Sequence, residues 1–207
     1  MILQQVARKV RNVLRGLIQR YGTADIKRRL WDTEFASGRW DCLENMAEDC
    51  LYPIVETYAK QGCILDLGCG PGATGNELST DKYDFYTGVD ISNVAIEKAR
   101  VRTERNHRSL KNEYYCSDIY SYTPTRTYDV IVLGDSIYYI PEKKIGMMLR
   151  RYCEYLNMEG VFIARIRGAY PSIIAIIERE FSLIENQLLY DSEICVIVFR
   201  PLEQLSS

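Results

Sequence analysis

Three glycines and one carboxylate gather within a short segment of this 207-residue chain. The segment Ile64–Gly72 reads Ile-Leu-Asp-Leu-Gly-Cys-Gly-Pro-Gly, with Asp66 directly before the alternating Gly68, Gly70 and Gly72. Glycine tolerates positive φ and leaves space for a ligand against the main chain. A ligand at such a turn also meets the free N–H groups of the helix that follows. The segment therefore predicts a nucleotide-type cofactor at the carboxyl edge of an open α/β sheet.

Asp66 helps to decide which cofactor this is. Gly70, Gly72 and Gly75 also satisfy the dinucleotide spacing G-x-G-x-x-G, so spacing alone leaves a nicotinamide or flavin enzyme open. A dinucleotide places a pyrophosphate at this turn, where a carboxylate would repel it. A cationic ligand with an amino group would instead be attracted.

With Asp66 included, the segment Asp-x-Gly-x-Gly-x-Gly resembles motif I of the class I S-adenosylmethionine-dependent methyltransferases. The resemblance covers roughly residues 60–200 and implies S-adenosylmethionine as the cofactor. Carried over to this sequence, it places Asp66, Gly68, Cys69 and Gly70 in the cofactor site.

Two further carboxylates follow expected strands. Asp90 ends the second strand, where a carboxylate can accept both hydroxyls of a ribose. Its alternative role, a helix N-cap, is better suited to Ser92. The resemblance implies that Ile91 lies against the adenine, that Asp118 receives the adenine amino group and that the backbone of Ile119 contacts the ring. For Asp118, an ordinary turn aspartate is the alternative.

The loop that leaves the fourth expected strand carries candidate catalytic residues. In the family this loop faces the transferred methyl group, so the resemblance places Gly134 in the cofactor site. Asp135 is the candidate base or amine-holding group, and Tyr138 and Tyr139 are expected to shape the catalytic pocket. Packing of the loop against the next helix is an equal alternative for both tyrosines.

The remaining polar candidates are less specific. Arg165 and Arg167 follow the fifth strand and can hold a carboxylate or phosphate of an acceptor, or simply pair with surface acids. Asp129 is expected to be structural. The single histidine, His107, lies in a helix-to-strand connection at the back edge of the sheet, so it is not expected to act as a base.

Aromatic residues precede the glycine segment. Trp31, Phe35 and Trp40 resemble the N-terminal segment of bacterial small-molecule methyltransferases, including the nodulation N-methyltransferases, which fold a helix over the cofactor. Trp40 is therefore expected in the cofactor site, although anchoring of the extension is the alternative. We expect residues 1–60 to form a helical extension or lid and residues 61–207 to form the cofactor-binding domain.

The pattern of apolar residues places these groups on alternating elements. Strands are expected at residues 63–67, 85–90, 112–116, 128–134, 160–166, 181–189 and 193–199. Helices are expected at residues 2–20, 25–35, 41–58, 72–79, 93–106, 142–156 and 170–178. The fold class is therefore α/β, with a mostly parallel sheet and right-handed crossovers. The resemblance implies a Rossmann-like seven-stranded methyltransferase sheet of order 3-2-1-4-5-7-6, with the last strand antiparallel.

Composition limits the class of partner and compartment. A net charge of −2 predicts no general affinity for nucleic acid. The seven cysteines include no C-x-x-C pair, so a reducing, cytoplasmic location is expected rather than a disulfide framework or a metal site. The chain has no apolar run of membrane-spanning length.

Charge is nevertheless uneven, because residues 1–30 hold eight Lys or Arg and one acid. The first helix should have an apolar stripe with basic flanks. It can lie on an anionic membrane, or its stripe can pack on the acidic body of the chain or on a second subunit of a homodimer.

These observations lead to one functional hypothesis and two alternatives. The hypothesis is methyl transfer from S-adenosylmethionine to an oxygen or nitrogen of a small molecule or glycan precursor. The alternatives are a protein that binds S-adenosylmethionine without transferring its methyl group and, less favoured, an NAD-type oxidoreductase.

Overall fold

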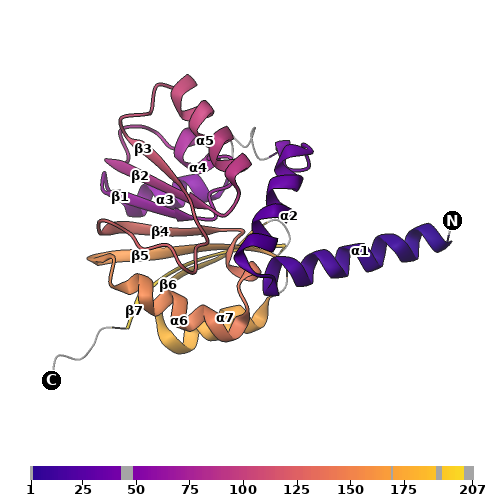
Figure 1. Ribbon diagram of the computed structural model, residues 1–207. Coiled ribbons are helices and arrows are strands. Elements are labelled where there is room, and N and C mark those ends of the chain that lie inside the picture. Colours follow the sequence, from indigo (N-terminus) through magenta and orange to yellow (C-terminus); the bar gives the residue numbers. More distant parts are fainter. Residues whose placement is uncertain (1, 43–48, 169, 190–192, 203–207) are drawn as a thin grey trace.

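The computed structural model describes residues 2–42, 49–168, 170–189 and 193–202. Figure 1 shows a central sheet flanked by helices, with one long helix that extends away from it. The strands are β1 (Cys63–Leu67), β2 (Phe85–Asp90), β3 (Asn112–Cys116), β4 (Tyr128–Gly134), β5 (Leu156–Arg167), β6 (Phe181–Leu189) and β7 (Ile194–Pro201). The helices are α1 (Ile2–Tyr21), α2 (Ala24–Ala36), α3 (Leu51–Ala59), α4 (Ala73–Glu77), α5 (Asn93–Arg105), the 3-10 helix η2 (Ile137–Tyr139), α6 (Glu142–Cys153) and α7 (Pro171–Glu180).

The sheet has the predicted topology. Its seven strands have the order β3-β2-β1-β4-β5-β7-β6. Strands β1 to β5 pair in parallel, whereas β7 is antiparallel to both of its neighbours, β5 and β6. The register places Asp66 beside Gly88 and Asp90 beside Cys116. The carboxyl ends of β1, β2 and β4, which lead into the expected site residues, consequently meet at one edge of the sheet.

The central strands are buried on both faces. In β4, Ile131 and Leu133 belong to a hydrophobic cluster that contains residues of α6 and α7. Val130 and Val132 belong to a second cluster with residues of α3 and α5. Successive side chains of a strand point to opposite faces, so a continuous apolar run indicates a strand covered on both sides. The carboxyl edge of the sheet, rather than either face, is therefore left for a ligand.

The third helix is shorter than predicted. The sequence predicted a helix over residues 41–58, but α3 begins at Leu51, and residues 43–48 lie outside the described part of the chain. Asp49 accepts the N–H of Leu51 at 2.9 Å and so satisfies one free donor of the first turn. The same carboxylate pairs with Arg165 from β5. A contact between distant residues thus marks the helix start, and apolar periodicity could not reveal it.

The boundary between α6 and β5 also differs from the prediction. The helix was expected to continue to residue 156 and the strand to begin at residue 160, but α6 ends at Cys153 and β5 begins at Leu156. The added strand residues extend the sheet, since Leu156 pairs with Tyr128 at the start of β4. The predicted turn at residues 190–192 lies outside the described residues.

The polar face of α1 contacts the rest of the molecule. Arg15 forms a two-pronged ion pair with Glu34 of α2. Arg20 donates hydrogen bonds of 2.9 and 3.1 Å to the carbonyl oxygen of Tyr138. These contacts turn the polar face of the helix toward the sheet domain.

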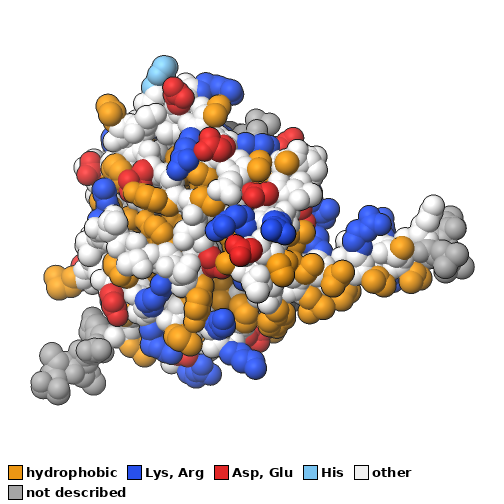
Figure 2. Space-filling model, in the orientation of Figure 1, with side chains coloured by type: hydrophobic (Ala, Val, Ile, Leu, Met, Phe, Trp, Pro, Cys, Tyr) orange, Lys and Arg blue, Asp and Glu red, His pale blue; other side chains and the backbone are white. Residues whose placement is uncertain are grey.

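The apolar stripe of α1 is left open to solvent. Ile18 is half-buried, but the other five residues of the stripe are more than half exposed: Val6, Val10, Val13, Leu14 and Leu17. Figure 2 shows hydrophobic side chains along this extended helix. The expectation that the stripe packs on the acidic body of the same chain is therefore wrong. None of the described helices is long and apolar enough to cross a membrane.

Candidate functional site

One cavity of about 1080 Å³ opens at the carboxyl edge of the sheet, beneath α1 and α2. All thirteen residues predicted for the cofactor and catalytic sites line it, although they come from distant parts of the sequence. They are Trp40, Asp66, Gly68, Cys69, Gly70, Asp90, Ile91, Asp118, Ile119, Gly134, Asp135, Tyr138 and Tyr139. The fold brings the predicted set together, while the role of each residue stays a prediction.

The glycine loop between β1 and α4 needs its glycines. Gly68 has φ +90°, and a Cβ added to it would lie 2.5 Å from the Cβ of Ser136. Gly70 has φ +52°, and its N–H points to the carboxylate of Asp90. An L side chain is strained in this left-handed region. The loop therefore keeps its main chain exposed toward the cavity.

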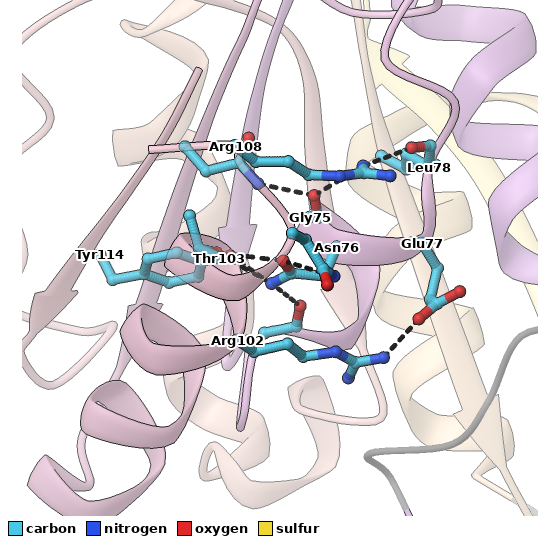
Figure 3. Close-up of polar contacts among 11 residues, drawn as sticks. Gly75, Asn76, Glu77, Leu78, Arg102, Thr103, Arg108 and Tyr114 are labelled. Carbon is cyan, nitrogen blue, oxygen red and sulfur yellow. Dashed lines mark hydrogen bonds and ion pairs between the residues drawn. The ribbon is translucent and has the colours of Figure 1, made fainter. Parts of the chain in front are cut away.

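A polar network behind the loop holds it in place, as Figure 3 shows. The Nδ2 of Asn76 donates to the Gly72 carbonyl oxygen and to the Thr103 hydroxyl, each at 2.9 Å. Arg108 donates to the carbonyl oxygens of Gly75 and Leu78. These bonds join the loop and α4 to α5, so the loop does not depend on a ligand for its shape.

Asp66 is buried at the end of β1, where its partners are neutral hydroxyl groups. The Tyr86 hydroxyl donates to its Oδ2 at 2.7 Å. Burial raises the pKa of Asp66 to about 6, an effect that hydrogen bonds with Tyr86 and Thr74 only partly offset. Among the described residues, no basic side chain forms an ion pair with it. Because an unpaired buried carboxylate is costly, the position suits the amino group of a cation.

Asp90 fastens the glycine loop to the end of β2. It accepts the N–H of Gly70 at 2.9 Å and the N–H of Ser92 at 2.8 Å. Burial raises the pKa of Asp90 to about 6 as well, although these two backbone bonds lower it in part. Ser92 caps α5, as predicted, by accepting the N–H of Ala95 at 3.2 Å. Each carboxylate oxygen has two lone pairs, so Asp90 can still accept ribose hydroxyls.

The loop after β3 places Asp118 and Ile119 on the cavity wall. The Oδ1 of Asp118 accepts the N–H of Tyr120 at 2.8 Å, which is the turn role that was its alternative. This bond uses one carboxylate oxygen, so the turn role leaves the other able to accept from a ligand. The carbonyl oxygen of Ile119 accepts the Tyr152 hydroxyl at 2.6 Å, so the loop is tied to α6.

Asp135 occupies a left-handed backbone conformation, with φ +55°, at the exit of β4. Its Oδ2 lies 2.8 Å from Arg165 and 3.7 Å from Arg167. Arg165 also pairs with Asp49, so two carboxylates of the chain hold the two ends of its guanidinium group. Burial lowers the pKa of Arg165, but the charges of Asp135 and Asp49 outweigh it and raise the pKa overall.

Aromatic rings form the wall on the side of α1 and α2. Tyr138 stacks on Tyr170 with 5.0 Å between ring centroids, and Tyr139 meets Trp31 edge to face at 5.0 Å. Trp31 and Trp40 lie 5.9 Å apart. The two tyrosines are half-buried, so they both pack within the loop and face the cavity.

Glu34 ties this aromatic wall to α1. The indole N–H of Trp40 donates to Glu34 at 2.9 Å, and Arg15 pairs with the same carboxylate. Burial raises the pKa of Glu34, but the bonds from Arg15 and Trp40 outweigh it, and the pKa is lowered overall. The Arg15 guanidinium lies 5.7 Å from the centroid of the Trp40 ring.

Two residues that were not expected to take part in the chemistry lie away from it. His107 is exposed and does not line the cavity. Asp129 accepts the N–H of Cys63 and the Nδ2 of Asn157, each at 2.7 Å, so its predicted structural role is confirmed.

Sequence reasoning missed several residues that line the cavity. Gln19 and Arg20 come from α1, Lys27 from α2, and Lys143 and Lys144 from the start of α6. Their positions depend on how α1 and α6 dock at the sheet edge. The one signal in the sequence was the polar face opposite the apolar stripe of α1.

Known proteins share this sequence pattern and architecture. Residues 64–160 match a family described as a methyltransferase domain. The mRNA cap guanine-N(7) methyltransferase of Schizosaccharomyces pombe is 31% identical over 114 residues, which are 50% of this chain and 31% of that protein. The malonyl-[acyl-carrier protein] O-methyltransferase of Bacillus anthracis is 24% identical over 123 residues, 58% of this chain and 44% of that protein.

Solved structures extend the likeness beyond the matched segment. An N-methyltransferase from Bradyrhizobium japonicum WM9, in complex with S-adenosyl-L-homocysteine, has a TM-score of 0.67 and 18% identity. The match covers 85% of this chain and 98% of that one. The chain therefore carries a methyltransferase domain at residues 64–160 and has the fold of the class I S-adenosylmethionine-dependent methyltransferases. It spans less than half the length of the two sequence relatives named above.

The buried carboxylates of the site should make the stability of the protein depend on pH. A raised carboxyl pKa contributes stability that is complete below the unfolded value, near 4, and is lost as the pH rises through about 6. Between pH 4.5 and pH 7, the wild type should therefore lose about 2 kcal/mol relative to Asp66→Asn. Urea unfolding of both proteins across this range measures the difference. The exposed Asp81→Asn is the control, and parallel curves for wild type and Asp66→Asn would contradict the burial argument.

Proposed function

We propose that this methyltransferase transfers a methyl group from S-adenosylmethionine to an oxygen or nitrogen of a small molecule or glycan precursor. The observation that carries the proposal is the pair of buried carboxylates, Asp66 and Asp90, beside a positive-φ glycine loop at the wall of the cavity. Neither carboxylate forms an ion pair with a described residue. A ligand with an ammonium group and a ribose supplies the partners that these two positions lack.

The chain's own residues bind the cofactor as follows. Asp66 holds the amino group, the loop of Gly68, Cys69 and Gly70 lies against the ligand, and Asp90 accepts the ribose hydroxyls. The remaining cofactor contacts are Ile91, Asp118 and Ile119 around the adenine, with Gly134 and Trp40 on the opposite walls. Residues 1–60 act as a lid over this site, and residues 61–207 form the binding domain, since α1 and α2 contribute to the cavity lining.

Catalysis is then mainly a matter of alignment. Bound S-adenosylmethionine supplies a methyl group on a positively charged sulfur, which is reactive toward nitrogen and oxygen. Asp135 takes the proton of a hydroxyl acceptor or holds an amine, with its other oxygen fixed by Arg165. Tyr138 and Tyr139 exclude water and orient the acceptor, which lowers the entropy cost of reaching the reactive geometry.

The cavity walls support a small polar acceptor. The described lining includes the basic residues Lys27, Lys143 and Lys144, which favour an acceptor with an acidic group. Some sequence relatives are mRNA cap methyltransferases, but the net charge of −2 gives this chain no general attraction to nucleic acid. The acceptor is therefore proposed to be a small molecule or glycan, with no nucleic-acid partner. All seven cysteines are free, which supports a reducing, cytoplasmic location.

We also propose that α1 lies on an anionic membrane surface. Its stripe faces away from the sheet domain, and residues 2–24 contain no acid. Arg8, Lys9 and Arg11 flank the stripe, and each basic side chain near such a surface contributes about 1 kcal/mol. A membrane contact there would bring the cavity toward a lipid-linked acceptor. The alternative partner of the stripe is a second copy of the chain in a homodimer.

Loss of Asp90 should weaken cofactor binding. We expect Asp90→Ala to raise the Kd for S-adenosylhomocysteine, because a charge-assisted bond contributes roughly 1.5–3 kcal/mol. Titration calorimetry measures this change. Asp129→Ala is a matched control, since it also removes a carboxylate that holds backbone, but away from the cavity. Equal affinity in the Asp90 variant would remove this residue from the site, and no binding by the wild type would remove the proposed function.

Loss of the Asp135 charge should affect turnover rather than cofactor affinity. Asparagine tolerates a left-handed backbone, so Asp135→Asn should fold normally and lower the rate of transfer from labelled S-adenosylmethionine by about 10²-fold or more. Its affinity for the cofactor should stay within a few-fold. His107→Ala should leave both quantities unchanged, and a large loss of rate in that variant alone would contradict the assignment.

The membrane proposal is tested by sedimentation with vesicles. Wild-type protein should sediment with phosphatidylserine-containing vesicles at low salt and remain in the supernatant with phosphatidylcholine alone. Leu14→Asp should abolish sedimentation, while Asn12→Asp, which makes the same charge change on the polar side of α1, should only reduce it. Failure of the wild type to sediment, with a dimer seen by analytical ultracentrifugation, would assign the stripe to a second copy.

A further inference from the structure

Unpartnered buried polar atoms concentrate in the cavity. Within the described part of the chain, five buried side-chain nitrogen or oxygen atoms have no hydrogen-bond partner. Three of them belong to residues that line the cavity: Gln19 Nε2, Arg165 Nε and Asp135 Oδ1. Buried polar groups are almost always hydrogen-bonded in native proteins. All three belong to residues of one cavity wall, so a ligand in this cavity is the nearest candidate partner for them.

Gln19 is the least expected member of this group. Only 3% of its surface is exposed, although it lies on α1, most of whose residues are exposed. It follows Arg15 by four residues and therefore shares its face of the helix. Arg15 is fixed by Glu34, and the adjacent Arg20 is fixed on the carbonyl of Tyr138. These two anchors hold the Gln19 amide at the cavity wall.

The surroundings of Gln19 belong to the acceptor end of the cavity. The neighbouring anchor Arg20 donates to the carbonyl oxygen of Tyr138, a residue proposed to orient the acceptor. Asp66 and Asp90, by contrast, find their partners in the glycine loop and β2. The amide thus lies with the residues proposed to surround the methyl acceptor.

We infer that Gln19 donates a hydrogen bond to the methyl acceptor, and that α1 thereby completes the acceptor site. The inference rests on the proposed function. Gln19 Nε2 and Arg165 Nε are donors, whereas Asp135 Oδ1 is an acceptor. A matching molecule presents an oxygen or ring nitrogen to Gln19 Nε2 and Arg165 Nε. It presents an N–H or O–H group to Asp135 Oδ1. That pattern describes a hydroxyl or amine next to a carbonyl or ether oxygen, as in sugars and amino sugars, and excludes a purely apolar amine.

The first test needs no acceptor. An unsatisfied buried amide destabilises the ligand-free protein, so Gln19→Met, which keeps the shape and removes the polar group, should raise the Tm by roughly 2–4 °C. Gln5→Met is the matched control, because it makes the same change at an exposed position of α1 and should leave the Tm unchanged. A Tm for Gln19→Met that is equal to or below that of the wild type would show a structural role and overturn the inference.

The second test separates acceptor from cofactor. Calorimetry with S-adenosylhomocysteine should give the same Kd, within twofold, for wild type and Gln19→Met. A fivefold or larger loss would make Gln19 a cofactor contact and overturn the inference. Failure of the wild type itself to bind S-adenosylhomocysteine would refute the proposed function, and the acceptor role of Gln19 with it, whereas a failure in the variant alone refutes only the assignment of Gln19.

Discussion

The hydrogen bond from the Gly70 N–H to Asp90 joins the loop after β1 to the end of β2, its neighbour in the sheet. It fixes the glycine loop against the end of β2, and the N–H of Ser92 holds the other carboxylate oxygen. Because α5 begins beside Ser92, the position of this helix follows from the same carboxylate. The carboxylate of Asp90 thus determines the positions of three elements: the glycine loop, β2 and α5. Its neighbour Asp66 adds a second buried carboxylate that has no cationic partner among the described residues.

The N-terminal helices act on the site through a different set of charges. Arg15 and Trp40 meet at Glu34, and Arg20 binds the loop that carries Tyr138. The strength of this connection comes from a partly buried carboxylate with several donors, which is more than an exposed ion pair would provide. Through this connection, the C-terminal half of α1 becomes part of the cavity wall. The N-terminal half of the helix extends away from the sheet domain. Most helical stability in proteins comes from packing of an amphipathic face, so the proposed membrane contact would stabilise the part of α1 that carries the exposed stripe.

The sequence predicted the parallel sheet from short-range patterns, whereas its strand order and most of the proposed cofactor residues followed from the resemblance to the methyltransferase family. Asp66 is recognised from its own glycine segment, and Asp90 and Asp118 from the strands that they follow. The alternation of strands and helices along the chain is enough to place all three carboxylates at one edge of a parallel sheet. Gln19 and Asp49 could not be found in this way, since nothing in their local sequence distinguishes them from other polar residues. Their roles arise only when α1 docks on Glu34 and when Arg165 reaches the start of α3.

The cluster of Arg165 with Asp49 and Asp135 is better explained by geometry than by stability. Buried ion pairs contribute little to folding because desolvation offsets their attraction, and a planar guanidinium binds two carboxylates in a fixed arrangement that a lysine would not reproduce. The cluster joins the start of α3, the end of β5 and the exit of β4. It also holds Asp135 in a left-handed conformation with one oxygen unpaired. A left-handed backbone and an unsatisfied oxygen in one residue are both unfavourable for folding. Under the proposed function, a bound acceptor supplies the partner that this oxygen lacks.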